Sequence, residues 1–246
     1  MDESRFQLTH GDAVAWLRGL PSGSIDLAIT DPPYESLEKH RAIGTTTRLK
    51  HSKASSNDWF AIFPNARFPE LFAEIYRVLK KDSHFYLFCD PETMFVAKPM
   101  AEQAGFKFWK PLIWDKLKIG MGYHYRARYE CVLFFEKGKR KLHDLGIADI
   151  IQAPRVNGGY PAEKPPQVAE ILVTQSTEPG ALVIDPFMGS GSTGVAAVRN
   201  GRHFGGNDLC AEAIEIARAR LVELGAREAA TERPAGASAP QLGLTL

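Results

Sequence analysis

The sequence predicts a doubly wound α/β domain on a parallel sheet, because short apolar runs that suit buried strands alternate with segments of helical periodicity. Hydrophobic residues make up 44% of the 246 residues, which is enough for a substantial core without disulfides or metals. No apolar run approaches the ~20 residues of a membrane span, and the polar N-terminus is unlike a signal peptide. We therefore expect one cytoplasmic domain over residues 1–225, with no membrane contact.

The N-terminal half begins with a strand and a helix over residues 6–20, which turn residues end at 21–23. Residues 24–30 (SIDLAIT) are a short apolar run between turn residues, as expected of a buried strand. Residues 69–80 carry apolar side chains at helical spacing after an initial proline. The next elements are a strand at 83–89, a helix at 92–104 that ends at Gly105, and strands at 106–114 and 129–135.

The C-terminal half continues the alternation after an irregular stretch at 144–163. The expected elements are a helix at 165–175, a strand at 181–184, a helix that ends near Gly201, a strand at 203–209 and a helix at 211–224. From residue 226 to 246 the chain is rich in Ala, Pro, Gly and Ser and has no periodic apolar face. We expect this segment to be a disordered tail.

Three segments combine basic and aromatic or polar residues, namely 35–66, 115–128 and 137–141 (KGKRK). A polar insert as long as the first is usually functional or disordered. Because the formal net charge is only +1, contact with a nucleic acid has to come from such local segments. A solvated surface is the ordinary role of any single Lys or Arg, but as a set the segments suit a phosphate clamp.

The cysteines argue against a metal site and against a disulfide framework. Cys89, Cys131 and Cys210 are odd in number, lie far apart and form no CxxC pair. This usage is typical of a reducing cytoplasm. We therefore expect no metal.

A glycine-rich turn follows the predicted strand at 181–184, in the sequence LVIDPFMGSGST over 182–193. Gly189 and Gly191 allow close approach of the backbone to a ligand, and the N-terminus of the next helix favours a carboxylate. Asp185 stands at the carboxyl end of the strand, where open α/β sheets bind ligands. The glycines alone are a weak dinucleotide signal, and a turn without a ligand remains an alternative. Asp208 suits a ribose contact and Asp12 an amine contact, or each caps the helix that follows.

A second turn, Asp31-Pro32-Pro33-Tyr34, directly follows the predicted strand at 24–30. Its two prolines stiffen the backbone and remove two N–H donors, so its carbonyls are free to accept hydrogen bonds. Asp31 adds a carboxylate acceptor and Tyr34 a flat face for stacking. These groups suit a base amine, although a rigid turn without a function explains the four residues equally well.

Together, DPPY at 31–34 and DPFMGSGST at 185–193 resemble the amino-methyltransferases of DNA, which modify adenine N6 or cytosine N4. The order, with the catalytic motif first, resembles the β class of that family. Residues 11–12, 163–166 (EKPP) and 201–224 also match family segments, so the resemblance covers about residues 6–224. It implies a class I methyltransferase fold with seven strands, of which one near an edge, at 129–135, runs antiparallel. It also implies S-adenosyl-L-methionine as cofactor and double-stranded DNA as partner, and it is compatible with a homodimer.

The resemblance assigns roles to two groups of residues. Catalysis falls to Asp31, Pro32, Pro33 and Tyr34, where Asp31 and the Pro32 carbonyl accept hydrogen bonds from the target amine and Tyr34 stacks on the flipped base. The cofactor-binding residues are Asp12 at the adenine end, Lys164 and Asp185 near the methionine part, Asp208 on the ribose, and Pro186, Phe187, Gly189, Ser190, Gly191, Ser192 and Thr193 along the turn. The chain departs from the family in having Tyr160-Pro161 for a usual His-Pro, and Asp208 for a usual Glu.

Adenine N6 is the favoured target, because the members of the family that modify cytosine N4 more often carry Ser at the position of Asp31. Methylation of cytosine C5 needs a Cys nucleophile, usually after a proline, and no cysteine of this chain follows one. Two further alternatives are a non-catalytic module that binds an adenosyl cofactor or a nucleic acid, and an NAD-dependent oxidoreductase. The intact Asp31 and Tyr34 argue against the first, and the lack of hydride-transfer residues against the second.

Overall fold

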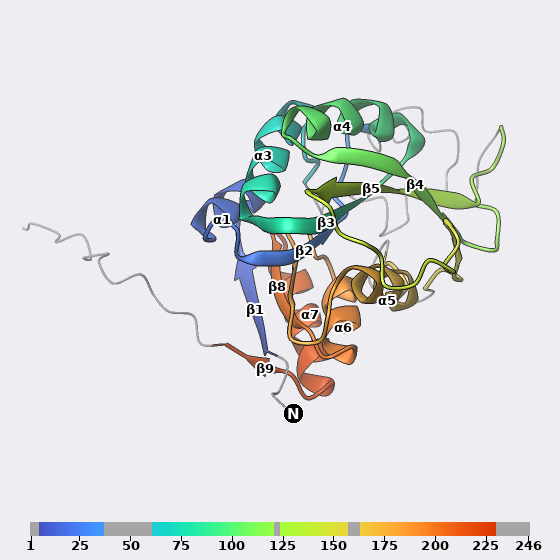
Figure 1. The fold of residues 1–246 in the computed structure, drawn as a ribbon. Coiled ribbons are helices and arrows are strands. Elements are labelled where there is room, and N and C mark those ends of the chain that lie inside the picture. The colour runs from blue at the N-terminus through green and yellow to red at the C-terminus, as the bar shows by residue number, and fades with distance from the viewer. Residues whose placement is uncertain (1–4, 37–60, 121–123, 157–162, 230–246) are drawn as a thin grey trace, which may run out of the picture.

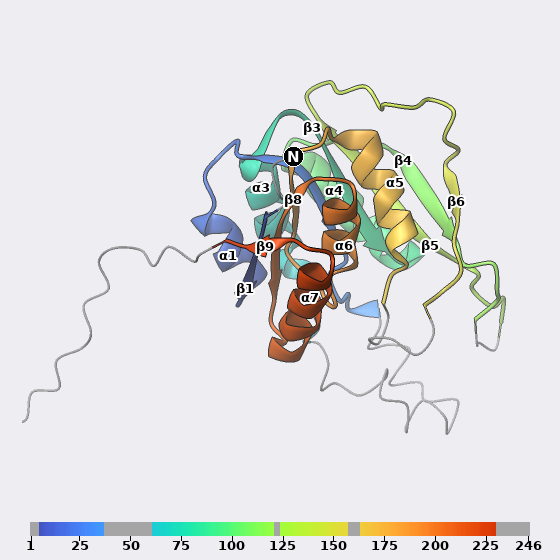
Figure 2. The ribbon, with the colours of Figure 1, turned by 90° about the horizontal axis from the view of Figure 1, so that it is seen from below.

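The protein is described here by a computed structural model that covers residues 5–36, 61–120, 124–156 and 163–229. Most of the predicted DNA-contacting insert, Tyr160-Pro161 and the chain from 230 onward lie outside these residues. The described residues form an α/β structure in which helices cover both faces of one twisted sheet (Figures 1 and 2).

The sheet has nine strands in the described residues, in the order β6-β4-β5-β3-β2-β7-β8-β1-β9. All neighbouring pairs are parallel except those of β5, which runs antiparallel to β3 and to β4. The strands are β1 (Arg5–His10), β2 (Ile25–Thr30), β3 (Leu79–Cys89), β4 (Lys107–Asp115), β5 (Tyr129–Lys137), β6 (Ile150–Gln152), β7 (Leu182–Asp185), β8 (His203–Asp208) and β9 (Arg227–Glu228). The predicted doubly wound class and the antiparallel strand at 129–135 are thus confirmed.

The prediction of seven strands was wrong by two short edge strands. β6 has three residues and β9 two, so neither is long enough to show a periodic pattern. β9 also corrects the expected start of the tail. Arg227–Glu228 pair with β1, the Ala229 amide donates to the Phe6 carbonyl at 2.7 Å, and Ala226 is buried. Residues 226–229 are therefore structured, because the open edge of β1 offers backbone partners that the local sequence does not reveal.

Two helical layers enclose the sheet, each with its own apolar core. Helices α1 (Ala13–Gly19), α3 (Phe68–Val78) and α4 (Pro91–Gln103) pack on one face, and a short 3-10 helix, η3 (Asn65–Arg67), leads into α3. Helices α5 (Pro166–Ser176), α6 (Ser192–Arg199) and α7 (Ala211–Glu223) pack on the other face (Figure 2). This layering brings the carboxyl ends of β2, β7 and β8 to one edge of the sheet, where the two predicted turns meet.

A buried histidine lies away from that edge, on β3. The side chain of His84 is fully buried, with Nδ1 2.8 Å from the Ser176 hydroxyl and Nε2 3.1 Å from the Arg140 carbonyl. The Tyr86 hydroxyl shares the Ser176 partner at 2.8 Å. Burial lowers the pKa of His84 to about 4, so its ring is neutral in the folded protein at neutral pH.

We expect acid to destabilise the fold through His84. The folded-state pKa lies below the ordinary value of about 6.5, so the unfolded chain takes up the proton first as the pH falls. The stability due to neutral His84 is complete above about pH 6.5 and is lost towards pH 4, by up to about 3 kcal/mol. Urea unfolding of the wild type and of His84→Gln across this range measures the difference. Parallel curves of unfolding free energy against pH for the two proteins would contradict it.

Candidate active site

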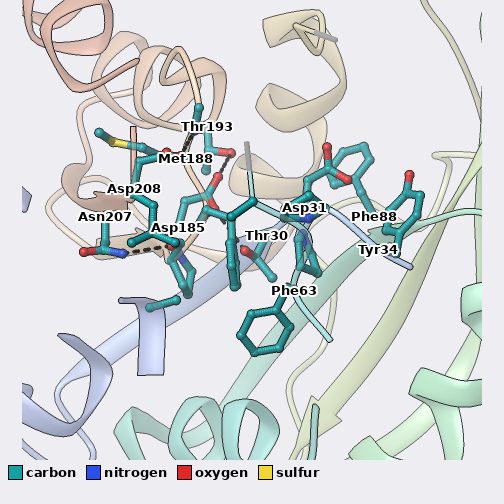
Figure 3. A pocket seen from close by; sticks show the side chains of 18 of the residues that line it. Thr30, Asp31, Tyr34, Phe63, Phe88, Asp185, Met188, Thr193, Asn207 and Asp208 are labelled. Carbon is teal, nitrogen blue, oxygen red and sulfur yellow. Dashed lines mark hydrogen bonds between the residues drawn. The ribbon is translucent and has the colours of Figure 1, made fainter. Parts of the chain in front are cut away.

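A cavity of about 330 Å³ opens at the sheet edge where β2, β7 and β8 end (Figure 3). Figure 3 shows Asn207 and Asp208 at one end, Asp31, Tyr34 and Phe88 at the other, and Asp185 between them. All the predicted site residues line the cavity except Gly191. They are Asp12, Asp31, Pro32, Pro33, Tyr34, Lys164, Asp185, Pro186, Phe187, Gly189, Ser190, Ser192, Thr193 and Asp208. The two motifs, far apart in the sequence, therefore share one cavity.

The Asp185 carboxylate holds the glycine-rich turn in place through three hydrogen bonds. Its Oδ1 accepts hydrogen bonds from the Thr30 hydroxyl and the Phe187 amide, both at 3.0 Å, and its Oδ2 accepts one from the Thr193 hydroxyl at 2.8 Å. The side chain is almost fully buried, and burial raises its pKa to about 7 against these hydrogen bonds. Asp185 thus joins the end of β2 to the start of α6 and sets the shape of the cavity floor.

Asp208 and Asn207 hold the opposite side of the same turn. The Asp208 carboxylate accepts the Gly189 amide at 2.9 Å and the Cys210 amide at 2.8 Å, and burial raises its pKa. The Asn207 side-chain amide donates to the Gly11 and Pro186 carbonyls, while its buried Oδ1 has no hydrogen-bond partner among the described residues. Sequence reasoning missed Asn207, although its position next to Asp208 at the carboxyl end of the strand was the available signal.

Asp12 fulfils the capping role that the sequence left open. Its Oδ1 accepts the Val14 and Ala15 amides, at 3.1 and 3.0 Å, at the N-terminus of α1. The carboxylate also pairs with Arg67, with 2.7 Å between Nη1 and Oδ2, and Arg67 lowers the pKa of Asp12. Arg67 lies 5.0 Å from the centre of the Phe63 ring. Neither Arg67 nor Phe63 was predicted, because both enter the cavity from the far end of the long insert.

The Asp-Pro-Pro-Tyr turn packs against this returning segment. The Pro33 carbonyl accepts the Phe63 amide at 2.7 Å, and the Phe63 ring meets the Phe187 ring edge-on, with 5.0 Å between ring centres. Tyr34 lines the cavity with only 7% of its surface exposed, and burial raises its pKa. Phe63 therefore lies between the two motifs and holds the Asp-Pro-Pro-Tyr turn in place.

Asp31 is part of a row of buried charges. The Lys164 ammonium lies 2.7 Å from Asp31 Oδ2 and 2.8 Å from Glu130 Oε2, and Lys116 pairs with Glu130 Oε1. Burial raises the pKa of Asp31, although Lys164 opposes the shift. Burial acts in the same direction on Glu130, but Lys164 and Lys116 outweigh it and hold the pKa at about 2. Lys164, expected near Asp185, thus contacts Asp31 directly. Sequence reasoning missed Glu130, an acidic residue in an apolar strand.

Gly191 has a structural role beside the cavity. It precedes α6 with φ of 80°, in the left-handed region, and a Cβ atom there would lie 2.8 Å from the Cβ of Ala217. Glycine therefore allows both the tight turn and the close packing of α7.

We expect Gly191→Ala to destabilise the protein more than Gly180→Ala does. Gly180 has a similar φ of 84°, but no atom lies within 4 Å of the position of its added Cβ. Both variants pay about 1–2 kcal/mol for the left-handed backbone, and only Gly191→Ala adds the clash with Ala217. Unfolding free energies from urea titration measure both losses. Equal losses would show that α7 yields to the extra methyl group.

Among the described residues, no group of three or more His, Cys, Asp or Glu side chains is arranged to hold a metal ion. No helix within the described ranges has the length and apolar character to cross a membrane.

Comparison with known proteins agrees with this geometry. A family model described as DNA methylase matches residues 25–157 and 146–219. The DNA adenine methyltransferase YhdJ of Escherichia coli (strain K12) is 27% identical over 254 residues, which cover 87% of this chain and 82% of the relative. The crystal structure of the M1.HpyAVI complex with S-adenosylmethionine superposes with a TM-score of 0.65 at 21% identity, over 88% of this chain and 100% of that one.

A further solved structure, the cytosine-N4-specific PvuII DNA methyltransferase, has a TM-score of 0.66 at 18% identity, over 92% of this chain and 95% of that one. These likenesses agree with the class I methyltransferase fold seen here. Because the family match spans most of the chain, this protein belongs to the DNA methylase family and is a methyltransferase that acts on DNA.

Proposed function

We propose that this methyltransferase transfers the methyl group of S-adenosyl-L-methionine to N6 of adenine in double-stranded DNA. The observation that carries the proposal is the position of Asp31, whose carboxylate lines the cavity with Oδ2 held by Lys164. Lys164 contacts Oδ2, and in the proposed reaction Oδ1 accepts the hydrogen bond of the base amine. The aspartate itself favours adenine over cytosine, because the cytosine-N4 branch of the family more often has serine there.

The cavity suits the cofactor in charge and in polar groups. S-adenosylmethionine carries its transferable methyl group on a positively charged sulfonium. The carboxyl groups of Asp31, Asp185 and Asp208 line the cavity, which favours a cation. The buried Asn207 Oδ1, without a partner in the described residues, suits a hydroxyl or amine donor at the Asp208 end. The volume of about 330 Å³ lies within the range of small-molecule sites.

The residues of the turn would act by positioning the amine. An exocyclic amine is a weak nucleophile because its lone pair is delocalised into the ring. Hydrogen bonds from the amine to Asp31 and to the Pro32 carbonyl favour a pyramidal nitrogen, whose lone pair can then point at the methyl group. Such positioning contributes up to about 7–11 kcal/mol in favourable cases. Tyr34, whose ring lines the cavity beside Asp31, offers a face for the base, which leaves the duplex at a cost of a few kcal/mol.

DNA contact is assigned to the basic segment at 115–128, together with the insert at 35–66. The run at 137–141 was also expected to contact DNA, but it lies at the opposite edge of the sheet, because β5 is antiparallel and Lys137 pairs with Ser83, near the start of β2. In the described part of 115–128, Tyr125 is fully exposed and Arg126 is exposed as well. Exposed cations neutralise phosphates, and an exposed aromatic ring stacks on bases. We also propose that the protein can act on DNA as a homodimer, and the oligomeric state of the purified protein tests this.

The test is a transfer assay with labelled S-adenosylmethionine and unmethylated genomic DNA, followed by mass spectrometry of the nucleosides. N6-methyladenine in the product supports the proposal. N4-methylcytosine would replace it with the second candidate, which the fold likeness to a cytosine-N4 enzyme keeps in view. Cofactor binding without any methylated base would point to a non-catalytic module.

A further inference from the structure

Four largely buried charged side chains of alternating sign form a row that ends at Asp31. Lys116 pairs with Glu130, Glu130 with Lys164 at 2.8 Å, and Lys164 with Asp31 at 2.7 Å. The exposed fractions of these side chains are 8% for Lys116, 19% for Glu130, 15% for Lys164 and 27% for Asp31. They come from four separate segments, which follow β4, lie on β5, precede α5 and follow β2. Several distant parts of the chain therefore converge on one carboxylate.

Such a row is not explained by stability. Burying charges is costly, and well-packed apolar residues in their place are often as stable or more so. Lys164 also lies over aromatic rings, 5.6 Å from the centre of Phe88 and 5.9 Å from that of Trp114, so apolar packing was available at this place. We therefore expect this row of charged side chains to serve the function of the cavity.

We propose that Glu130 is a positioning residue for methyl transfer, which acts on Asp31 through Lys164. The inference rests on the proposed role of Asp31 as the acceptor of the amine hydrogen bond. Lys164 occupies Oδ2 of Asp31, and Glu130 occupies a second side of the same ammonium group. Lys116 in turn holds the other oxygen of Glu130. Because Glu130 and Asp31 both hold the ammonium group, Lys164 is kept on Oδ2 of Asp31, and Oδ1 serves the base amine in the proposed reaction.

Glu130 also adjusts the charge at Asp31. Its carboxylate raises the pKa of Asp31, in the same direction as burial, whereas Lys164 and Lys116 lower it. Without the negative charge of Glu130, Asp31 would be a weaker base and a weaker acceptor. In addition to burial, Asp31 in turn raises the pKa of Asp185 on β7, Tyr34 after β2 and Cys89 at the end of β3, and Arg155 after β6 lowers that of Lys116. Asp90 acts on Tyr34 and Cys89.

Glu130→Gln tests the inference, with Glu136→Gln as the matched control. Gln keeps the shape of the side chain and removes its charge. Glu136 lies on the same strand, six positions on and therefore on the same face, is buried, and accepts hydrogen bonds from Trp109 and Arg140 outside the cavity. We expect Glu130→Gln to lower the single-turnover rate on the order of 10²-fold, with the affinities for S-adenosylmethionine and DNA unchanged. The control should keep the rate.

The pH profile separates positioning from a merely structural effect. Removing the charge of Glu130 lowers the pKa of Asp31, so the acidic limb of the single-turnover profile should move to lower pH in Glu130→Gln and stay in place in Glu136→Gln. A rate equal to that of the control with an unmoved limb overturns the inference. A lost rate accompanied by lost cofactor binding also overturns it, because the role is then structural.

A second readout is independent of activity. The carboxyl carbon of Asp31 can be titrated by NMR in protein labelled with ¹³C-aspartate and assigned from Asp31→Asn. We expect its titration to move to lower pH in Glu130→Gln, and an unmoved titration overturns the inference. If the wild type methylates no base in DNA, the proposed function fails, and this titration still decides whether Glu130 acts on Asp31.

Discussion

Asp31→Ala is expected to abolish methyl transfer and to leave the binding of S-adenosylmethionine largely intact. The proposed reaction needs an acceptor for the base amine, and Asp31 is the carboxylate that Lys164 presents in the cavity. Loss of a positioned group that handles a proton or hydrogen bond in the transition state typically costs about 10²–10⁴-fold in rate. Because Asp185, Asp208 and the glycine turn are untouched, the end of the cavity proposed for the cofactor keeps its shape. Single-turnover transfer and equilibrium binding measure the two effects separately.

Asp26→Ala is the matched control for this experiment. Asp26 lies on the same strand, β2, and also pairs with a lysine, with 2.7 Å between its Oδ1 and Lys80 Nζ. It is not among the residues that line the cavity, so its loss should affect stability and not the rate of transfer. Lost cofactor binding with normal residual transfer in Asp31→Ala would contradict the role assigned to Asp31. The transition-state role would then belong to the Pro32 carbonyl or to a group outside the turn.

The sequence could predict those parts of the site in which the reactive side chains and the residues that form the turn are adjacent in the chain. Each motif directly follows a buried strand, and parallel strands end at a common edge, so Asp31 and Asp185 were expected near one another. The turns also carry their own conformational signals, in the prolines at 32–33 and the glycines at 189 and 191. The antiparallel strand at 129–135 was predicted correctly because the family resemblance implied it.

The side chains that contact these residues could not be predicted. They depend on the pairing register of the strands and on where the chain re-enters the cavity after the long insert. Glu130 reaches Lys164 only because β5 is inserted between β3 and β4, and a slip of one residue would turn it to the other face. Arg67 and Phe63 enter the cavity at the end of an insert whose sequence has no periodic pattern. The short β6 and β9 form because existing strands offer open edges, which is a property of the folded sheet rather than of their own sequences.

Lys164→Met is expected to destabilise the protein by about 3–5 kcal/mol at pH 8, which is the usual cost of leaving a buried charge without its partner. Burial lowers the pKa of Lys164, but Asp31 and Glu130 more than offset this and raise it, so the side chain is charged in the folded protein. Methionine fills a similar volume beside Phe88 and Trp114 without supplying the charge. Urea unfolding measures the loss. Lys80→Met is the matched control, since its exposed pair with Asp26 contributes at most about 1 kcal/mol.

The pH dependence of that loss identifies its cause. Without Lys164, burial raises the folded-state pKa of Asp31 further, and that of Glu130 rises as well. A carboxyl whose folded-state pKa exceeds the unfolded value of about 4 favours the fold when protonated, and its contribution is lost as the pH rises through the folded-state pKa. The deficit of Lys164→Met relative to the wild type should therefore grow from pH 5 to pH 8. Glu130→Gln added to Lys164→Met should reduce this growth, because one of the two carboxylates that Lys164 neutralises is gone. A deficit that is constant with pH would instead assign the loss to packing around Phe88 and Trp114, and the charge row would then have no energetic coupling to Asp31.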